Sequence, residues 1–309
     1  MNRPHAAEAA LAWNTIVWGA TFVLVKAALD HVSALLFLAL RFSLATLALV
    51  LIFRRADGRL LPLFRRAEGR LLPSAHWKPI LAGALTGTFL FAGYLFQTQG
   101  LRFTTAPKSA FITGLTSVMV PLLVALVYRN RPQVSELAGV LVATAGMGLM
   151  SLQGDIGSIG KGDLLTFFCA IGFAAHIVTL GHFSEHVRFE LLSIGQVGAA
   201  ALWALALFGW VEQPRLEWRP VVVYAILVTG LLATALAFTL QAWAQQYTTS
   251  TRTALIYMLE PVFAWMTSYF LAGQGLSGRA AAGAVLILGG VLLVELKPLN
   301  VSLHPTRKK

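Results

Sequence analysis

The sequence contains little cysteine and little charge. Cys169 is the only cysteine among 309 residues, so the chain can build neither a disulfide framework nor a thiolate metal cluster. We expect this side chain to be a small buried apolar group. Charged residues make up 12% of the chain, against about 25% in typical soluble domains. Such a chain is a poor candidate for a water-soluble protein.

Motifs for catalysis are also missing from the sequence. It has no HExxH zinc motif, no GxSxG nucleophile motif and no glycine-rich loop that would cradle a phosphate. Asp30, Asp155 and Asp163 fall at the ends of apolar stretches, which leaves Glu260 without a second acid beside it. A membrane-embedded enzyme and an ATP-driven pump are therefore disfavoured. We predict no cofactor and no bound metal.

Long apolar stretches dominate what is present. The chain is 57% hydrophobic with a mean hydropathy of +0.71. Continuous apolar runs long enough to cross a bilayer as helices exclude a strand barrel, whose strands alternate in polarity. We predict an all-α integral membrane protein with ten transmembrane helices, at 9–29, 34–53, 79–100, 108–128, 134–152, 163–183, 190–211, 220–245, 252–272 and 280–297. The first run carries Lys26 and leads into another run, so we read it as a retained helix and not a signal peptide.

The positive charges are distributed unevenly between the loops. The net charge is +11, from 24 Lys and Arg against 13 Asp and Glu. If the N-terminus lies inside, the inner segments hold 16 Lys and Arg and the outer segments hold 6. This excess follows the positive-inside rule and predicts cytoplasmic termini in a bacterial inner membrane. The charge is thus a topology signal, and we expect no nucleic-acid partner.

The two halves of the chain resemble each other. A shift of 144 residues places Gln97 on Gln241, Lys108 on Arg252 and Gly146 on Gly290, and a shift of 155 places Trp18 on Phe173. We predict two five-helix repeats, in residues 1–155 and 156–309. Because five is odd, the second repeat must be inverted relative to the first, as in many secondary transporters.

The order of these motifs resembles the EamA family of the drug/metabolite transporter superfamily. The resemblance covers nearly the whole chain and rests on Trp18-Gly19-x-x-Phe22, Leu40-Arg41-Phe42, Tyr247-Thr248-Thr249 with Arg252 and Ala254, Leu259-Glu260-Pro261-Val262, Gly283 and Gly290. It implies ten helices, cytoplasmic termini and export of amino acids or other small metabolites. The subgroup that it suggests is that of the aromatic amino acid exporters.

Polar and aromatic residues fall at helical spacing beside two prolines. Pro121 and Pro261 cannot donate to the carbonyl four residues back, so we expect interrupted helices there, which are typical of transport sites. We expect the substrate to be bound in a central cavity by Trp18, Tyr94, Gln97, Thr113, His176, Phe238, Gln241, Tyr257 and Glu260. The alternative is that the polar members only hydrogen-bond between helices.

Four ionisable residues lie inside the apolar runs: Lys26, Arg41, His176 and Glu260. A charge at the bilayer centre costs about 2.5 to 3.5 kcal/mol, so each needs a partner, a wet cavity or an escape to the interface. Lys26 and Arg41 are close enough to helix ends to snorkel, whereas Glu260 and His176 are not. Proton coupling through Glu260 and His176 and facilitated diffusion both stay open.

These observations favour a secondary transporter that exports small metabolites, most of all aromatic or other large neutral amino acids, by alternating access. A channel or facilitator is the alternative, and the inverted repeat favours the transporter. The expected partners are the substrate and membrane lipid. The fifth and tenth runs, which are rich in small residues, should pack together, and their outer faces are candidates for a homodimer contact.

Overall fold

The computed structural model describes residues 3–57, 77–104, 106–129, 133–151, 160–272 and 277–295, and almost all of them are helical. Within these ranges no residue belongs to a β-strand, and Val32 and Leu216 form an isolated bridge between two loops. The apolar stretches leave the backbone groups no water to bind, so helices satisfy them internally. The all-α fold predicted from the hydropathy is confirmed.

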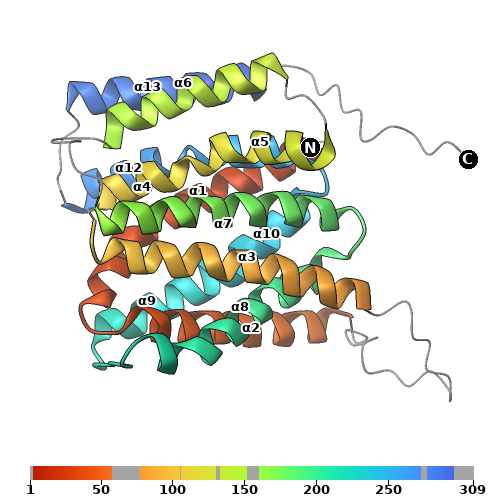
Figure 1. Ribbon diagram of the computed structural model, residues 1–309, viewed down its shortest axis with the longest axis vertical. Helices are drawn as coiled ribbons and strands as arrows, with labels where there is room; N and C mark the ends of the chain where they lie inside the picture. Colours follow the sequence, from red (N-terminus) through yellow and green to blue (C-terminus); the bar gives the residue numbers. More distant parts are fainter. Residues whose placement is uncertain are drawn as a thin grey trace, which may run out of the picture.

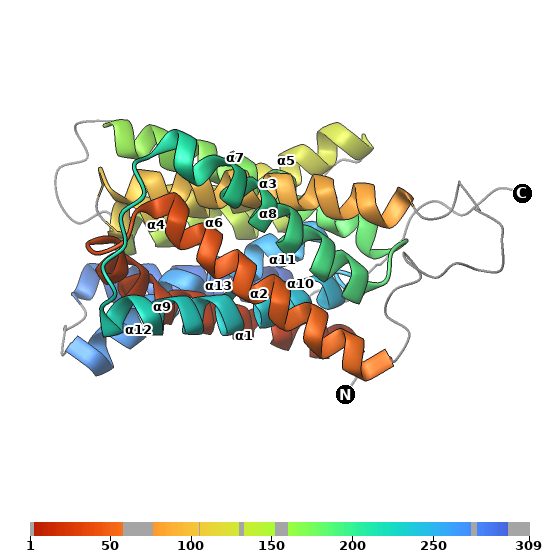
Figure 2. The same cartoon turned by 90° about the horizontal axis from the view of Figure 1, so that it is seen from below.

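The helices run alongside one another between two ends of the molecule (Figures 1 and 2). In chain order they are α1 (Arg3–Leu29), α2 (Ala34–Asp57), α3 (Trp77–Leu101), α4 (Ala106–Gly114), α5 (Thr116–Tyr128), α6 (Val134–Ser151), α7 (Lys161–Ser184), α8 (Phe189–Val211), α9 (Pro220–Gly230), the π-helix η1 (Leu231–Leu236), α10 (Ala237–Ala244), α11 (Ser250–Tyr257), α12 (Glu260–Ala272) and α13 (Gly278–Glu295).

Seven helical segments within the described ranges are long and apolar enough to span a membrane. They are Arg3–Leu29, Ala34–Arg54, Trp77–Leu101, Ser109–Tyr128, Lys161–Ser184, Phe189–Val211 and Pro220–Ala244. The remaining predicted runs are the shorter apolar helices α6 and α13 and the interrupted pair α11 and α12. The chain is therefore a multi-pass membrane protein, whereas the count of ten spans stays a prediction.

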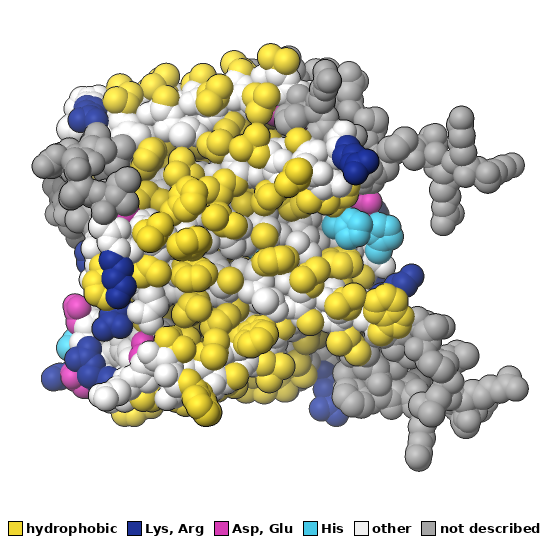
Figure 3. All heavy atoms as spheres, viewed as in Figure 1, with side chains coloured by type: hydrophobic (Ala, Val, Ile, Leu, Met, Phe, Trp, Pro, Cys, Tyr) yellow, Lys and Arg dark blue, Asp and Glu magenta, His cyan; other side chains and the backbone are white. Residues whose placement is uncertain are grey.

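The surface of the molecule matches the bilayer. Figure 3 shows hydrophobic side chains across the middle of one face and charged side chains gathered at its two ends. Large apolar residues point outward from several helices, among them Leu126, Leu141, Leu202, Trp210 and Leu292. A soluble monomer rarely exposes such a continuous apolar surface, which instead suits contact with lipid.

Two helices are interrupted at corresponding places in the two halves. α4 and α5 are separated at Leu115, and α11 and α12 at Met258 and Leu259. The shift of 144 residues that relates Gln97 to Gln241 also relates Leu115 to Leu259. Interruptions were expected at the prolines, and for the first half this was wrong, because Pro121 lies within α5, six residues beyond the break. Pro261 lies in the first turn of α12, where a proline needs no amide partner.

Glycines allow the closest helix contacts. A Cβ on Gly139 of α6 would lie 2.7 Å from the Gly290 carbonyl oxygen of α13, and one on Gly146 would lie 2.5 Å from that of Gly283. Figure 1 shows α6 and α13 side by side at one edge of the molecule. The predicted close packing of the fifth and tenth runs is confirmed. Their use as a dimer contact stays a prediction.

Candidate functional site

Phe238 on α10 lies at the centre of an aromatic cluster. Its ring centroid lies 5.6 Å from that of Trp18 on α1, 6.1 Å from that of Tyr94 on α3 and 5.7 Å from that of His176 on α7. Tyr257 on α11 joins the cluster through Trp18, at 4.8 Å. Five residues predicted from the sequence to bind substrate are thus brought together from five helices.

The π-helix η1 supplies backbone acceptors to this cluster. In an α-helix the Ala237 N–H would bond the carbonyl of Ala233, but here it donates to those of Leu232 and Thr234. The Ala233 carbonyl instead accepts from Trp18 Nε1, at 2.9 Å, and from Arg41 Nη2, at 3.3 Å. One irregular turn therefore holds side chains from α1 and α2.

Arg41 on α2 is buried and does not snorkel to the interface. Only 4% of its surface is exposed, and its Nε donates to Thr234 Oγ1 at 2.6 Å. Its Nη2 also donates to the Tyr94 hydroxyl, at 3.1 Å, and the guanidinium lies 4.5 Å from the Tyr94 ring centroid. The snorkelling alternative is therefore wrong for Arg41. For Lys26, whose side chain is exposed, snorkelling stays a prediction.

Glu260 begins α12, immediately after the second helix interruption. The residue is half-buried and follows Tyr257, a member of the aromatic cluster, by three residues. No residue in the part of the chain that the structure describes forms a hydrogen bond or an ion pair with it. Glu260 is thus an acidic residue beside the aromatic cluster that has no hydrogen-bonding or ion-pair partner among the described residues.

His176 forms the end of a short hydrogen-bonded chain. Its Nε2 lies 2.7 Å from Gln196 Oε1 on α8, and Gln196 Nε2 donates to the carbonyl of Phe238 at 3.4 Å. Because the amide nitrogen of Gln196 is used toward Phe238, its oxygen is the acceptor and His176 Nε2 carries the proton. The chain fixes Phe238 from α8 and gives His176 a structural partner.

The other three predicted residues lie farther from Phe238 in this network. Thr113 on α4 has its hydroxyl 3.7 Å from the Cys169 thiol, and Cys169 is buried, as expected. Gln241 Nε2 donates to Gln245 Oε1 at 3.3 Å, while its own oxygen is buried without a partner. Gln97 is half-buried on α3 and forms no hydrogen bond with a described residue. None of the three has a ring contact or a hydrogen bond with the aromatic cluster.

The family follows from comparison with known sequences. The EamA-like transporter family matches residues 7–152 and, a second time, residues 160–296. The chain belongs to the EamA-like transporter family. Family membership together with the helical fold identifies a membrane transporter, and it indicates a transporter rather than an enzyme.

Relatives of this EamA-like transporter carry transporter names. An uncharacterized transporter of Archaeoglobus fulgidus is 32% identical over 291 residues, which cover 94% of this chain and 86% of that protein. The uncharacterized transporter YetK of Bacillus subtilis is 23% identical over 74% of this chain and 71% of that protein. A solved crystal structure superposes with a TM-score of 0.74 at 19% identity, covering 94% of this chain and 97% of that chain, and shows that the fold is shared.

Several residues of this EamA-like transporter were missed by the sequence analysis as site residues. Arg41 was named as an intramembrane charge but was left out of the site, and Gln196, which pairs with His176, was not considered for binding. Asn14 donates to the carbonyl of Ala237 and lies 3.5 Å from the Tyr257 hydroxyl. Phe173 lies 5.1 Å from Tyr94. The rule that intramembrane ionisable groups mark function could have found Arg41.

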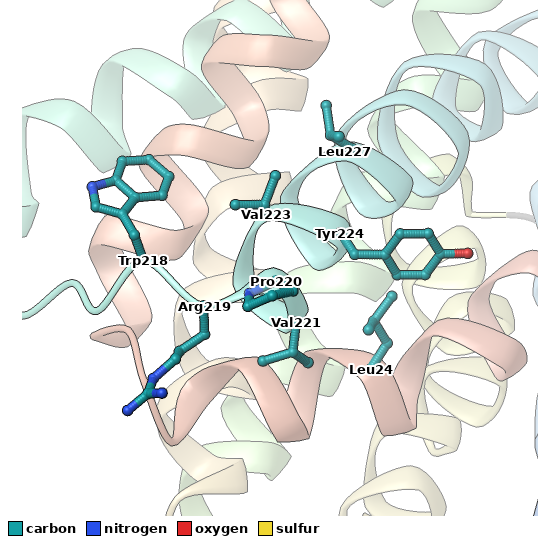
Figure 4. A pocket seen from close by; sticks show the side chains of 8 residues that line it. All are labelled: Leu24, Trp218, Arg219, Pro220, Val221, Val223, Tyr224 and Leu227. Atoms are coloured by element: carbon teal, nitrogen blue, oxygen red, sulfur yellow. The ribbon is translucent and has the colours of Figure 1, made fainter.

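A hollow on the outside of the transporter is not part of this site. It lies between α1 and the start of α9, where Figure 4 shows Tyr224 and Leu24 on one side and Arg219 at its end. Its lining is almost wholly apolar and it opens broadly to the surroundings. None of the residues predicted to bind substrate lines it. Its position on an apolar outer face suits contact with a lipid chain.

Proposed function

We propose that this protein is a secondary transporter that exports aromatic or other large neutral amino acids by alternating access. The observation that carries the proposal is a pair of equivalent contacts. The shifts of 144 and 155 residues relate Tyr94 to Phe238 and Trp18 to Phe173. The contact between Tyr94 and Phe173, at 5.1 Å, therefore has its counterpart in the contact between Phe238 and Trp18, at 5.6 Å. A site built twice from equivalent residues suits two halves that rock around it.

The glycine contacts support ten helices in two inverted five-helix repeats. Gly139 and Gly283 are equivalent by the shift of 144, as are Gly146 and Gly290. The contacts join Gly139 to Gly290 and Gly146 to Gly283, so exchanging the two halves reproduces the pair. From Gly139 to Gly146 the contacted glycine changes from Gly290 to Gly283, so the two helices run in opposite directions and α6 and α13 are antiparallel. Equivalent helices that run in opposite directions are expected only if one repeat is inverted.

The lining of the site supports the substrate class. Trp18, Phe173 and Tyr257 lie between helices and yet keep part of their surface accessible. Aromatic walls with a few polar groups suit a small solute that has an apolar side chain. The amino-acid class also follows the family resemblance, and the direction of export is carried over from it.

A channel is the alternative, and counter-flow distinguishes the two. Only a carrier couples the inward movement of one substrate molecule to the outward movement of another. An enzyme is disfavoured because Glu260 has no second carboxylate and, within the described part of the chain, no cluster of His, Cys, Asp and Glu could hold a metal.

Uptake into liposomes tests the substrate class. Purified protein would be offered radiolabelled phenylalanine, tryptophan, leucine, a nucleoside and a sugar. We expect saturable uptake of the amino acids, and we expect Phe238→Ala to reduce it at least tenfold. Phe167→Ala, which changes an exposed ring on α7, is the matched control and should keep normal uptake. Saturable uptake of the nucleoside or the sugar alone would contradict the proposed substrate class.

A further inference from the structure

We propose that Arg41 and Glu260 are the two poles of a receptor for a zwitterion, with Arg41 binding the carboxylate and Glu260 the ammonium group of an α-amino acid. The inference rests on the proposed function and specifies how its substrate is recognised. It predicts that a transported molecule must carry both a carboxylate and an ammonium group.

Arg41 is a buried cation with neutral partners only. Its hydrogen bonds go to the Thr234 hydroxyl, the Tyr94 hydroxyl and the Ala233 carbonyl, through Nε and Nη2. Its Nη1, with two further N–H groups, has no acceptor among the described residues. A guanidinium buried without an anion is costly, and its planar fork fits a carboxylate better than any other common group. The two N–H groups of Nη1 thus point to an anionic group as the ligand of Arg41.

Glu260 is an acidic residue without a cationic partner among the described residues. It lies in the first turn of α12, at the interruption, and no described Lys, Arg or His pairs with it. The three N–H donors of an ammonium group would satisfy such a carboxylate. Placing a charged carboxylate inside an apolar run costs about 2.5 to 3.5 kcal/mol, and a partner of this kind would offset that cost.

Arg41 and Glu260 lie beside the same aromatic cluster and form no ion pair with each other. Arg41 donates to the Tyr94 hydroxyl, and Glu260 follows Tyr257 by three residues, across the interruption between α11 and α12. Opposite charges in an apolar interior attract strongly. If Arg41 and Glu260 served only to neutralise each other, we would expect them to form an ion pair. A ligand that carries both charges would supply each of these two residues with an opposite charge.

An α-amino acid carries its two charges close together. Its amine nitrogen and its carboxyl carbon are about 2.5 Å apart, from the standard bond lengths and angle at Cα. With these ends at Arg41 and Glu260, its side chain would project among Phe173 and Phe238, which contact Tyr94, and Trp18, which contacts Phe238. A purely anionic solute would be repelled by Glu260, and a purely cationic one by Arg41.

Ligand-induced stabilisation of the purified full-length protein tests this inference. A ligand that binds the folded state raises Tm by mass action, so a titration gives its apparent Kd. The probes are L-phenylalanine, N-acetyl-phenylalanine, which lacks the ammonium group, and phenylalaninamide, which lacks the carboxylate. For the unmodified protein we expect phenylalanine to bind at least tenfold more tightly than either analogue.

The variants assign each end of the probe to a residue. Arg41→Gln should weaken the binding of phenylalanine at least tenfold, while the apparent Kd of phenylalaninamide should change less than threefold. Arg41→Lys should restore part of the lost affinity for phenylalanine. Glu260→Gln should weaken the binding of phenylalanine but leave the apparent Kd of N-acetyl-phenylalanine unchanged. Lys26→Gln, at an exposed cation on α1, should change none of the three affinities.

The outcomes separate the inference from the proposed function. Equal losses for phenylalanine and both analogues in Arg41→Gln would show that Arg41 only holds the helices together, which overturns the inference alone. Equal binding of the three probes by the unmodified protein would do the same. If no amino acid stabilises the protein or enters liposomes, the proposed function fails along with the inference.

Discussion

Trp18 and Arg41 depend on a backbone carbonyl that a regular α-helix would not offer. Both donate to Ala233, whose α-helical donor, the Ala237 N–H, is directed elsewhere by the π-helix. π-helical turns occur often at functional sites, because they turn backbone groups toward side chains. The position of Arg41 beside Tyr94 is thus fixed partly by the backbone of another helix.

The Trp18 hydrogen bond can be tested by one substitution. Trp18→Phe keeps an aromatic ring against Phe238 and Tyr257 but removes the donor to Ala233. We expect the free energy of unfolding to fall by about 1 to 3 kcal/mol, because the bond and some packing are lost. Reversible unfolding in detergent by denaturant measures this change.

Trp13→Phe is the matched control on the same helix, because half of that side chain is exposed. It should lower the stability by less than about 0.5 kcal/mol, as is usual for surface substitutions. Equal losses in the two variants would contradict the role given to the Trp18 hydrogen bond.

At the residue scale the sequence predicted which aromatic residues come together but not the placement of Arg41. The aromatic members were found because rings at helical spacing beside amides are visible in one dimension. Arg41 stayed ambiguous, because its distance from a helix end does not say whether the side chain turns toward lipid or toward Thr234. The π-helix from Leu231 to Leu236 contains no proline or glycine, so no residue within it indicates an irregular turn.

At the element scale, neighbouring glycines of α13 have different surroundings. A Cβ on Gly290 would lie 2.6 Å from the Gly139 carbonyl oxygen and 2.8 Å from the Ala143 Cβ. A Cβ on Gly289 would have no atom within 4 Å. Gly290 thus permits close helix packing, whereas Gly289 has no contact that requires a glycine.

These glycines make a matched pair of substitutions. Gly290→Ala should destabilise the protein by about 1 to 3 kcal/mol, since the α6 and α13 backbones must move apart. Gly289→Ala should leave stability unchanged or raise it by up to about 1 kcal/mol, because alanine favours the helix. Denaturant unfolding of both variants in one detergent measures the difference. A loss for Gly289→Ala as large as that for Gly290→Ala would contradict the packing described.

The helices themselves were predictable because hydropathy reports them directly. Seven of the predicted runs correspond to the helical segments that are long and apolar enough to span a membrane. The place of the first interruption was not predictable from the proline rule. A proline within α5 is tolerated there, and the break falls at Leu115 instead. Only the repeat relation to Leu259 could have indicated this position.

At the scale of the whole molecule, each end is held together by its own polar contacts. At one end Arg252 pairs with Glu8 at 3.2 Å, joining α11 to α1. At the other, Arg215 donates to the Asp30 carbonyl and His31 lies 3.0 Å from Glu217. Positive charge predicts that the first end is cytoplasmic, although much of the excess lies in segments outside the described residues.

Cysteine labelling tests this orientation. In a Cys169→Ser background, Glu185→Cys at the first end and Trp218→Cys at the second each place one exposed thiol. We expect a membrane-impermeant maleimide to label only Trp218→Cys in intact cells and only Glu185→Cys in inside-out vesicles. The reverse pattern would mean that the positive-inside assignment is wrong, and labelling of both thiols from one side would exclude two ends on opposite faces.

Counter-flow tests the central claim, alternating access at the aromatic site, most directly. Liposomes containing the protein are loaded with unlabelled L-phenylalanine and diluted into a trace of the labelled amino acid. The account predicts a transient accumulation of label above its equilibrium level, absent from unloaded and protein-free liposomes and reduced at least tenfold by Phe238→Ala. Entry of label that rises to equilibrium without an overshoot, equally in loaded and unloaded liposomes, would contradict the account and indicate a channel.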